Sequence, residues 1–308
     1  MEIEMENRSF HEVTIIGAGV AGMTCAMYLK RAGVDVCLIG DYTTTPLLSS
    51  PSIQNYPGIK DISGLDYLTQ LHEQIVDLGV CLIEATAMSP MIKDDGWIII
   101  TDDGNVVDTK NLVIATGSSA RMLNLENEED FIGKGVSTCA YCDGSLYTDK
   151  NVAVVGSGTL AIEEAVYLAK ICKRVTILCR KTKFSTDIYT PEQLTKYPNI
   201  VLTFDAPITK IVGTENGLMV ILGGRRSRVM SFDGMFYAMG SHPNTEFLDG
   251  LYPLDSNGYI DMPQEAASKH HMYCCGDVNA SNKFKQAVTA AADGCNTALQ
   301  ILKDLKTN

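Results

Sequence analysis

Apolar residues along this chain form short, strand-like runs that alternate with segments of helical periodicity. Two units stand out, and each consists of a strand, a turn, a helix and a second strand. The first unit is expected as strand 13–16, helix 23–31 and strand 34–39, and the second as strand 151–155, helix 162–170 and strand 174–178. Strands that alternate with helices are typical of α/β folds with parallel sheets.

The remaining patterned segments suggest how the chain is divided. They are a hairpin-like stretch at 97–105, a buried strand at 112–117, a strand-rich region at 200–230, an apolar run at 235–240, a strand at 272–278 and a helix at 285–305. Polar residues 118–130 and 241–245 predict two crossings between domains.

Two crossings predict a split domain with another domain inserted into it. We therefore expect residues 1–117 and 245–308 to form one domain and residues 118–244 to form the second.

A glycine-rich turn follows the first strand of the first unit. Gly17-Ala18-Gly19-Val20-Ala21-Gly22 is the G-x-G-x-x-G dinucleotide fingerprint between a strand and a helix. Gly17 permits a tight turn, Gly19 lets the backbone approach a pyrophosphate, and Gly22 lets helix and strand pack closely. The pyrophosphate is expected at the helix N-terminus, where free N–H groups favour an anion. Asp41, after the next strand, either binds a ribose hydroxyl or is an ordinary turn residue.

The fingerprint recurs in the second unit. Gly156-Ser157-Gly158-Thr159-Leu160-Ala161 reads G-x-G-x-x-A, with Ala161 in the packing position. Two such motifs, each in a strand–turn–helix context, predict two nucleotide-binding domains of the Rossmann type.

Cys139 and Cys142 are two residues apart, and Asp143 directly follows the second cysteine. This spacing suits a disulfide or two metal ligands. A zinc site needs a second Cys or His pair, and none is suitably spaced, since the adjacent Cys274 and Cys275 are poor chelators. We therefore expect a redox pair and no metal, with two packed apolar thiols as the alternative.

Composition and charge exclude several other classes of protein. Of the 308 residues, 45% are hydrophobic and 20% are charged, which suits a globular protein. The net charge of −12 argues against nucleic acid as a partner. The acidic start Met1–Glu6 does not resemble a signal peptide, and no apolar run approaches the roughly 18 residues of a membrane span. Ten cysteines without a signal favour a reducing cytoplasm.

Taken in order, these motifs resemble the low-molecular-weight thioredoxin reductases, FAD-dependent members of the pyridine nucleotide–disulfide oxidoreductases. The resemblance covers about residues 11–303. Besides the fingerprints and the cysteine pair, it rests on Asn55-Tyr56-Pro57-Gly58, Ala115-Thr116-Gly117, Gly276-Asp277-Val278 and Lys285-Gln286-Ala287. It implies an α/β fold of two Rossmann-like domains, FAD in the split domain, NADPH in the inserted one, and a homodimer.

The resemblance also implies roles for individual residues. Cys142 faces the flavin and accepts its electrons, Cys139 attacks the disulfide of a thioredoxin-like protein, and Asp143 handles the proton. Asp277 holds a ribityl hydroxyl. The other positions implied to bind the flavin cofactor are Asn55, Ala115, Gly276, Lys285, Gln286 and Ala287.

Three departures from the family pattern leave the electron donor open. The family's Gly-Gly-Gln before Asn55 is replaced by Thr44-Thr45-Pro46. Cys274-Cys275 is unexpected. Arg180 and Lys181 remain from the family's His-Arg-Arg-x-x-x-Arg, which binds the 2′-phosphate of NADPH, but its His and last Arg are absent.

We therefore expect NADPH as donor. The alternative donor is NADH. Two alternative kinds of enzyme use no pyridine nucleotide, a ferredoxin-linked reductase and a dithiol oxidase. The last alternative is a flavoprotein of the ferredoxin–NADP⁺ reductase type or one without enzymatic activity, although such proteins lack a redox pair.

Overall fold

The computed structural model describes residues 7–186, 191–224, 227–248 and 250–306, so the acidic start Met1–Glu6 lies outside them. The chain divides into two compact units. Unit 1 comprises Met1–Ser50, Tyr56–Ser119 and His242–Asn308, and unit 2 comprises Pro51–Asn55 and Ala120–Ser241. Pro51–Asn55 is thus grouped apart from the segments that flank it. Whether FAD and NADPH divide between the units stays a prediction.

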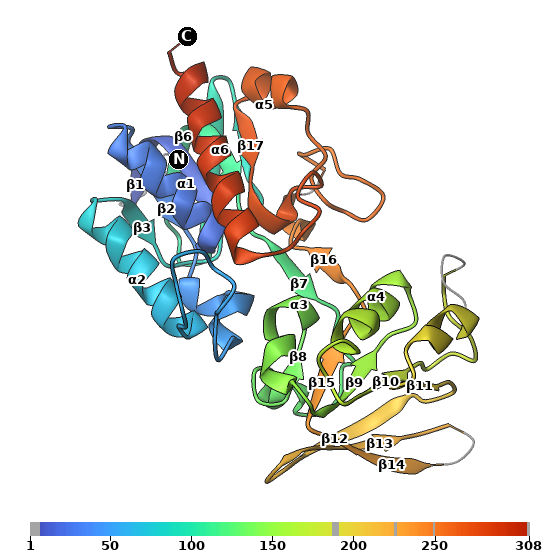
Figure 1. Ribbon diagram of the computed structural model, residues 1–308. Helices are drawn as coiled ribbons and strands as arrows, with labels where there is room; N and C mark the ends of the chain where they lie inside the picture. The colour runs from blue at the N-terminus through green and yellow to red at the C-terminus, as the bar shows by residue number, and fades with distance from the viewer. Residues whose placement is uncertain (1–6, 187–190, 225–226, 249, 307–308) are drawn as a thin grey trace. The chain divides into compact units, whose positions relative to one another are not determined.

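Unit 1 contains a seven-stranded sheet in the order β3-β2-β1-β6-β5-β4, with β17 also paired to β6 (Figure 1). Strands β1, β2, β3, β6 and β17 pair in parallel, whereas β4 and β5 are antiparallel. The bounds are β1 Arg8–Ile16, β2 Val36–Ile39, β3 Cys81–Ile83, β4 Met91–Lys93, β5 Gly96–Ile100, β6 Val106–Ile114 and β17 Met272–Cys274. Strand β6 is the centre of this sheet because it pairs with three neighbours.

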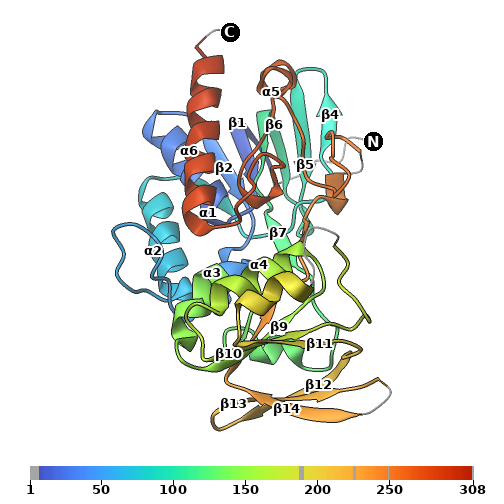
Figure 2. The same cartoon turned by 45° about the vertical axis from the view of Figure 1, so that its right-hand side comes forward.

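The main helices of unit 1 cover one face of this sheet. Helices α1 (Val20–Arg31) and α6 (Ala287–Asp304) lie side by side (Figures 1 and 2). They touch closely because Gly294 has no side chain to collide with the Ala21 backbone. The core on this side joins both helices to α2 (Gly64–Asp77) and the sheet. The remaining helical segments are α5 Gln264–His270, η1 Tyr42–Thr44, η2 Pro46–Ser49, η6 Glu246–Leu248 and η7 Gly276–Val278.

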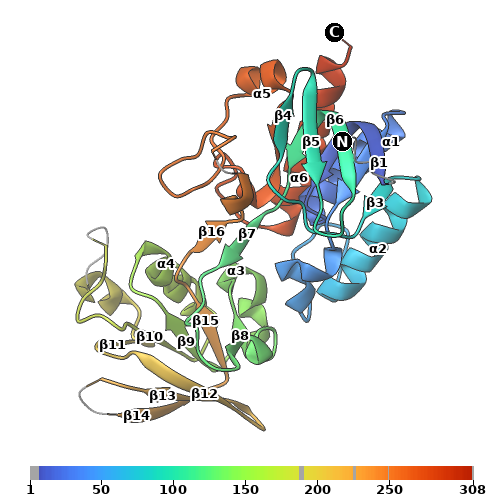
Figure 3. The same ribbon diagram turned by 180° about the vertical axis from the view of Figure 1, so that it is seen from behind.

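Unit 2 contains a smaller sheet in which β11-β10-β9 have the same relative order as β3-β2-β1 of unit 1. Its five parallel strands lie in the order β11-β10-β9-β15-β8, and an antiparallel layer, β12-β13-β14, covers the face opposite α4 (Figures 1 and 3). The strands are β8 Val136–Ser137, β9 Asn151–Val155, β10 Arg174–Leu178, β11 Ile200–Thr203, β12 Ile208–Thr214, β13 Gly217–Leu222, β14 Arg228–Phe232 and β15 Gly234–Tyr237. The helical segments are α3 Ala140–Asp143, α4 Thr159–Leu168, η3 Glu128–Phe131, η4 Gly144–Tyr147 and η5 Pro191–Lys196.

The two chain crossings pair with each other. Strands β7 (Ser118–Ala120) and β16 (Ser241–Pro243) form a two-stranded sheet. Asn244 supports it, because its side chain donates to the Thr116 carbonyl oxygen at 2.8 Å and accepts from Ser119 Oγ at 2.9 Å.

The observed elements correct several predicted boundaries. Strands β9 and β10 occupy the predicted residues, but α1 begins at Val20 rather than at residue 23, and α4 covers 159–168 rather than 162–170. Both helices start directly after the middle glycine of the fingerprint, because that glycine is the N-cap and the third small residue lies inside the helix. Strand β2 begins at Val36 rather than at residue 34, and α6 ends at Asp304.

Candidate active site: a redox disulfide and two glycine turns

The cysteine pair lies at the start of α3 in unit 2. Cys139 and Cys142 are joined by a disulfide, as predicted. Cys139 is the N-cap of α3, and the Cys142 N–H donates to Cys139 Sγ at 3.2 Å. Hydrogen bonding to sulfur favours its thiolate form, so after reduction Cys139 is the better candidate for the nucleophile.

A serine connects the disulfide to the acid beside it. Ser137 Oγ accepts from the Cys139 N–H at 3.0 Å and donates to Asp143 Oδ2 at 2.6 Å. Burial raises the pKa of Asp143, and the hydrogen bond from Ser137 opposes this rise. The other carboxyl oxygen, Oδ1, is buried without a hydrogen-bond partner. Asp143 can therefore hold a proton close to the cysteines. The sequence pattern did not identify Ser137.

A second buried acid, Glu164, lies behind α3. Glu164 is on α4, is 4% exposed, and accepts a hydrogen bond from the Ala140 N–H at the start of α3. Its Oε2 is buried without a hydrogen-bond partner. Burial raises its pKa to about 7, although the bond from Ala140 acts in the opposite direction. Glu164 thus fixes the first peptide of α3, a role that no sequence motif indicated.

The first glycine turn is tightly constrained on one side and open on the other. Gly17 has φ +117°, and a β-carbon there would collide with the carbonyl oxygen of Ala115, which follows β6. Gly22 packs against Gly17 in the same way. At Gly19, in contrast, the nearest atom to an added β-carbon is Thr45 Cγ2 at 3.8 Å. No side chain among the described residues caps α1, so its first N–H groups can bind an anion.

The second turn reproduces this geometry in unit 2. A β-carbon on Gly156 would meet the carbonyl oxygen of Ala238, which follows β15, at 2.5 Å and the Ala161 side chain at 2.7 Å. Gly158 has no neighbouring atom within 4 Å of such a carbon. In the described structure α4 likewise lacks a side-chain cap. Both fingerprints therefore leave room for a phosphate at the middle glycine.

Asp277 lies in η7, and its neighbour Gly276 packs against Ala21 at the start of α1, so Asp277 lies close to the first turn. Its Oδ1 is buried without a hydrogen-bond partner, and burial raises its pKa to about 6 against the opposing charge of Lys285. An unpartnered buried acceptor costs about 1–3 kcal/mol, so a ligand hydroxyl that donates to it is favourable. Lys285 Nζ binds the Asp277 carbonyl oxygen at 2.7 Å.

The other predicted ligands of unit 1 have defined local roles. Gln286 is the N-cap of α6 in a capping box with Thr289, and Ala287 is the first helical residue. The Gly276 N–H donates to Asp293 at 2.8 Å, so Asp293, which the sequence pattern missed, holds the Asp277 loop.

Two predicted ligands lie outside this group. Asp41 Oδ1 caps the short helix η1 by accepting from the N–H and hydroxyl of Thr43, which is the turn role considered above. Asn55 is exposed and is grouped with unit 2.

Arg180 and Lys181 follow β10 and are exposed beside the second turn. Lys181 Nζ donates to Ser185 Oγ at 3.0 Å, and Ser185 Oγ lies 2.7 Å from Ser157 Oγ. Cations and hydroxyls therefore gather at the start of α4. Ser185, which stands where the family has its last arginine, is part of this group.

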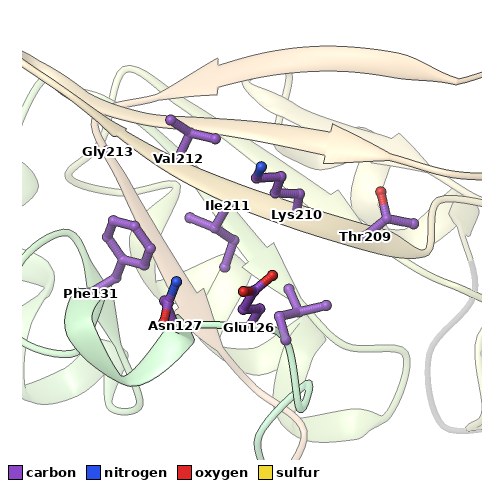
Figure 4. Close-up of a pocket in the computed structure, with 9 residues that line it drawn as sticks. Glu126, Asn127, Phe131, Thr209, Lys210, Ile211, Val212 and Gly213 are labelled. Carbon is purple, nitrogen blue, oxygen red and sulfur yellow. The ribbon is translucent and has the colours of Figure 1, made fainter.

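A separate cavity of about 350 Å³ lies in unit 2 (Figure 4). Leu125, Glu126, Asn127, Phe131 and residues of strand β12 line it, and Figure 4 shows Glu126, Asn127 and Phe131 opposite that strand. Neither the cysteine pair nor the glycine turn contributes to it, so it plays no part in the site described here.

Comparisons with known proteins agree with these features. The pyridine nucleotide-disulphide oxidoreductase family matches residues 11–294. Thioredoxin reductases of Dictyostelium discoideum and Rickettsia typhi are 31% and 32% identical, over 96% of this chain and over 97% and 98% of those proteins. The crystal structure of thioredoxin reductase from Streptococcus pyogenes MGAS5005 has a TM-score of 0.89 at 27% identity and covers 97% of this chain and 99% of its own. Among the described residues, no helix is long and apolar enough to cross a membrane.

Substitution can separate the roles of the first and the middle glycine of this turn. Gly19→Ala should leave the melting temperature of the apoprotein unchanged but weaken FAD binding at least about tenfold, because the methyl group occupies the open side of the turn. Gly17→Ala should lower the melting temperature, since strain and collision there cost on the order of 1–3 kcal/mol. If Gly19→Ala binds FAD with wild-type affinity, as measured by flavin fluorescence, the phosphate of FAD does not bind at this turn.

Glu164→Gln should stabilise the protein at neutral and alkaline pH but not near pH 4.5. The pKa of about 7 lies above the ordinary value of 4.5, so the native state binds more protons than the unfolded chain between these values. Stability is therefore lost as pH rises through this window, by up to about 3 kcal/mol. We expect Glu164→Gln to unfold at higher urea concentration than wild type at pH 8 and at a similar concentration near pH 4.5.

The exposed neighbour Glu163 provides the matched control, and Glu163→Gln should show no such pH dependence. Equal effects of Glu164→Gln at both pH values would contradict the raised pKa.

Proposed function

The chain belongs to the pyridine nucleotide-disulphide oxidoreductase family and to its thioredoxin reductases, and we propose that it passes electrons from NADPH through FAD and the Cys139–Cys142 disulfide to a thioredoxin-like protein. The observation that carries this proposal is the disulfide at the start of α3, with the buried Asp143 linked to it through Ser137. A disulfide in a protein of the reducing cytoplasm is typically catalytic.

Reduction of the partner follows from ordinary thiol–disulfide exchange. Cys139 Sγ, as a thiolate, attacks one sulfur of the partner disulfide, and the other partner sulfur leaves as a thiolate. Cys142 Sγ then attacks Cys139 Sγ in the mixed disulfide, which releases the second partner sulfur and restores the Cys139–Cys142 disulfide. One electron pair moves from the dithiol to the partner, and two protons follow it.

Asp143 is suited to move a proton in this exchange. Its raised pKa lets the carboxyl group hold a proton at higher pH than an exposed aspartate can, and its Oδ1 has no competing hydrogen bond. The carboxyl group would accept a proton as a cysteine becomes a thiolate and return it to a leaving sulfur. Ser137 holds Oδ2 and so orients the group.

The residues of unit 1 fit FAD. Gly19 leaves space for a pyrophosphate at the uncapped start of α1, and Asp277 Oδ1 needs a hydroxyl donor. When bound, the reduced flavin would supply the electron pair that reduces the disulfide, and NADPH would supply the hydride that reduces the flavin again. Asn55, Ala115 and Lys285–Ala287 are proposed as further FAD contacts.

NADPH is the proposed donor because cations lie beside the second turn. Arg180 and Lys181 would bind the 2′-phosphate through charge-assisted hydrogen bonds. Gly158 leaves the corresponding phosphate site of the turn open. NADH is disfavoured because no acid stands at Cys179 or Arg180 to bind a ribose hydroxyl.

A ferredoxin-linked reductase or a dithiol oxidase is the second candidate. It is favoured by the replacement of the family's last arginine by Ser185, which already engages Lys181. A non-enzymatic or ferredoxin–NADP⁺ reductase-type flavoprotein is disfavoured by the Cys139–Cys142 disulfide.

We also propose that the protein is a cytoplasmic homodimer. The described residues include eight cysteines outside the disulfide, all free, which suits a reducing compartment. The homodimer is proposed from the resemblance to thioredoxin reductases.

Replacing either cysteine of the pair should abolish thioredoxin reduction and leave FAD bound. Cys142→Ser should also trap the partner as a mixed disulfide with Cys139, because no second thiol remains to resolve it. Non-reducing electrophoresis with thioredoxin measures the adduct, and Cys274→Ser is the matched control that should retain turnover. Full reductase activity in either Cys139→Ser or Cys142→Ser would exclude the pair from the reaction.

Arg180→Ala should raise the apparent KM for NADPH by about tenfold, equivalent to about 1.4 kcal/mol, if Arg180 binds the 2′-phosphate. The variant should be reduced by dithionite as fast as wild type. Anaerobic spectra of the wild-type flavin with NADPH, NADH and reduced ferredoxin in turn identify the donor. A flavin that stays oxidised under excess NADPH but is reduced by ferredoxin would show that the NADPH assignment is wrong.

A further inference from the structure

Three potential metal ligands from adjacent strands of unit 1 converge on one another. His11 is on β1, Cys37 on β2 and Cys81 on β3. Cys37 and Cys81 are Cα partners in the parallel pairing of β2 with β3, so their side chains project from the same face. One ligand atom of each residue lies within 4.8 Å of the other two. Across the part of the chain that the structure describes, this is the one group of three such ligands.

The histidine of this group is already oriented as a metal ligand would be. His11 Nδ1 lies 3.0 Å from Asp35 Oδ2, whereas Nε2 is buried without a hydrogen-bond partner. A carboxylate on one ring nitrogen holds the proton there and leaves a lone pair on the other nitrogen. A buried nitrogen without a partner is costly, and a cation would satisfy it.

The distances suit a small cation bound by sulfur and nitrogen. Zinc bonds of about 2.3 Å to sulfur and about 2.0 Å to nitrogen place tetrahedral ligand atoms roughly 3.5–3.8 Å apart. Rotations that move the ligand atoms by about an ångström would close the present group around such an ion. Thiolate and imidazole together select soft or borderline cations over Mg²⁺ and Ca²⁺.

An ion can also reach the group. Strand β3 is at the edge of the sheet, Cys81 is half-buried, and 12% of the His11 side chain is exposed. Cys37 is fully buried and closes the inner side. Cys37 and Cys81 interact with each other, and Cys81 also interacts with His11, so the three side chains already face one another.

We propose that His11 Nε2, Cys37 Sγ and Cys81 Sγ form a binding site for a divalent cation of the Zn²⁺ type, with Asp35 as the residue that orients His11. Water or a small ligand fills the fourth position. The bound ion would join β1, β2 and β3, and binding to the folded state alone would raise the melting temperature. This site is independent of the proposed reductase function, since none of its residues belongs to the redox pair or the glycine turns.

The test uses the full-length, FAD-loaded protein with Cys139→Ser and Cys142→Ser, because a reduced Cys139/Cys142 pair would itself bind zinc. The protein is reduced, freed of metal, incubated with Zn²⁺ and desalted. We expect about one zinc per chain by elemental analysis and a higher melting temperature than that of the metal-free protein. Co²⁺ should give the intense long-wavelength bands of a tetrahedral site, which lie beyond the flavin absorption.

Variants in the same background assign the ligands. Cys81→Ser and His11→Gln should each weaken zinc affinity at least about 100-fold in competition with a chromophoric chelator, and Asp35→Asn about 10-fold. Cys274→Ser, a half-buried cysteine of the same unit, should change nothing. A parent protein that retains no zinc, or equal retention in Cys81→Ser and His11→Gln, would overturn the site. The flavin spectrum of each variant verifies its fold.

Discussion

Both units depend on the close approach of a glycine turn to the backbone of a neighbouring strand. The first glycine of each fingerprint lies against a carbonyl oxygen, that of Ala115 after β6 or that of Ala238 after β15. A side chain there would push the helix away from the sheet. Because the contact is with backbone, no neighbouring side chain can move to relieve it. The middle glycine faces open space at the start of a helix that no described side chain caps. The close contact of the first glycine therefore places free backbone N–H groups where they can bind an anion.

The redox chemistry depends on burial rather than on this turn. Cys139, Ser137 and Asp143 form a compact hydrogen-bonded group at the start of α3. Glu164 fixes the other side of that helix through the Ala140 N–H. Burial raises the pKa of both acids, so each favours its protonated form more than an exposed acid does. The disulfide at the start of α3 is therefore linked to Asp143 through Ser137, Glu164 binds the adjacent peptide of Ala140, and both acids hold protons more readily than exposed acids do.

Much of the fold could be predicted because its signals are local. The fingerprints at Gly17 and Gly156, strands β9 and β10 and the Cys139–Cys142 pair are all readable within a few neighbouring residues. Helix α2 went unpredicted although Ser63 caps it by accepting from the Asp66 N–H. Partners distant in sequence were also missed. Asp293 holds Gly276, and His11, Cys37 and Cys81 meet only because three strands pair in register.

We infer that the Cys139–Cys142 disulfide exchanges electrons with a flavin bound to the same chain. Anaerobic titration with dithionite tests it by counting the electrons taken up per bound flavin. A flavin and a disulfide each take up two electrons, so the wild-type protein should require about four and the Cys139→Ser/Cys142→Ser variant about two. Equal uptake of about two electrons by both proteins would contradict electron exchange between the disulfide and the flavin.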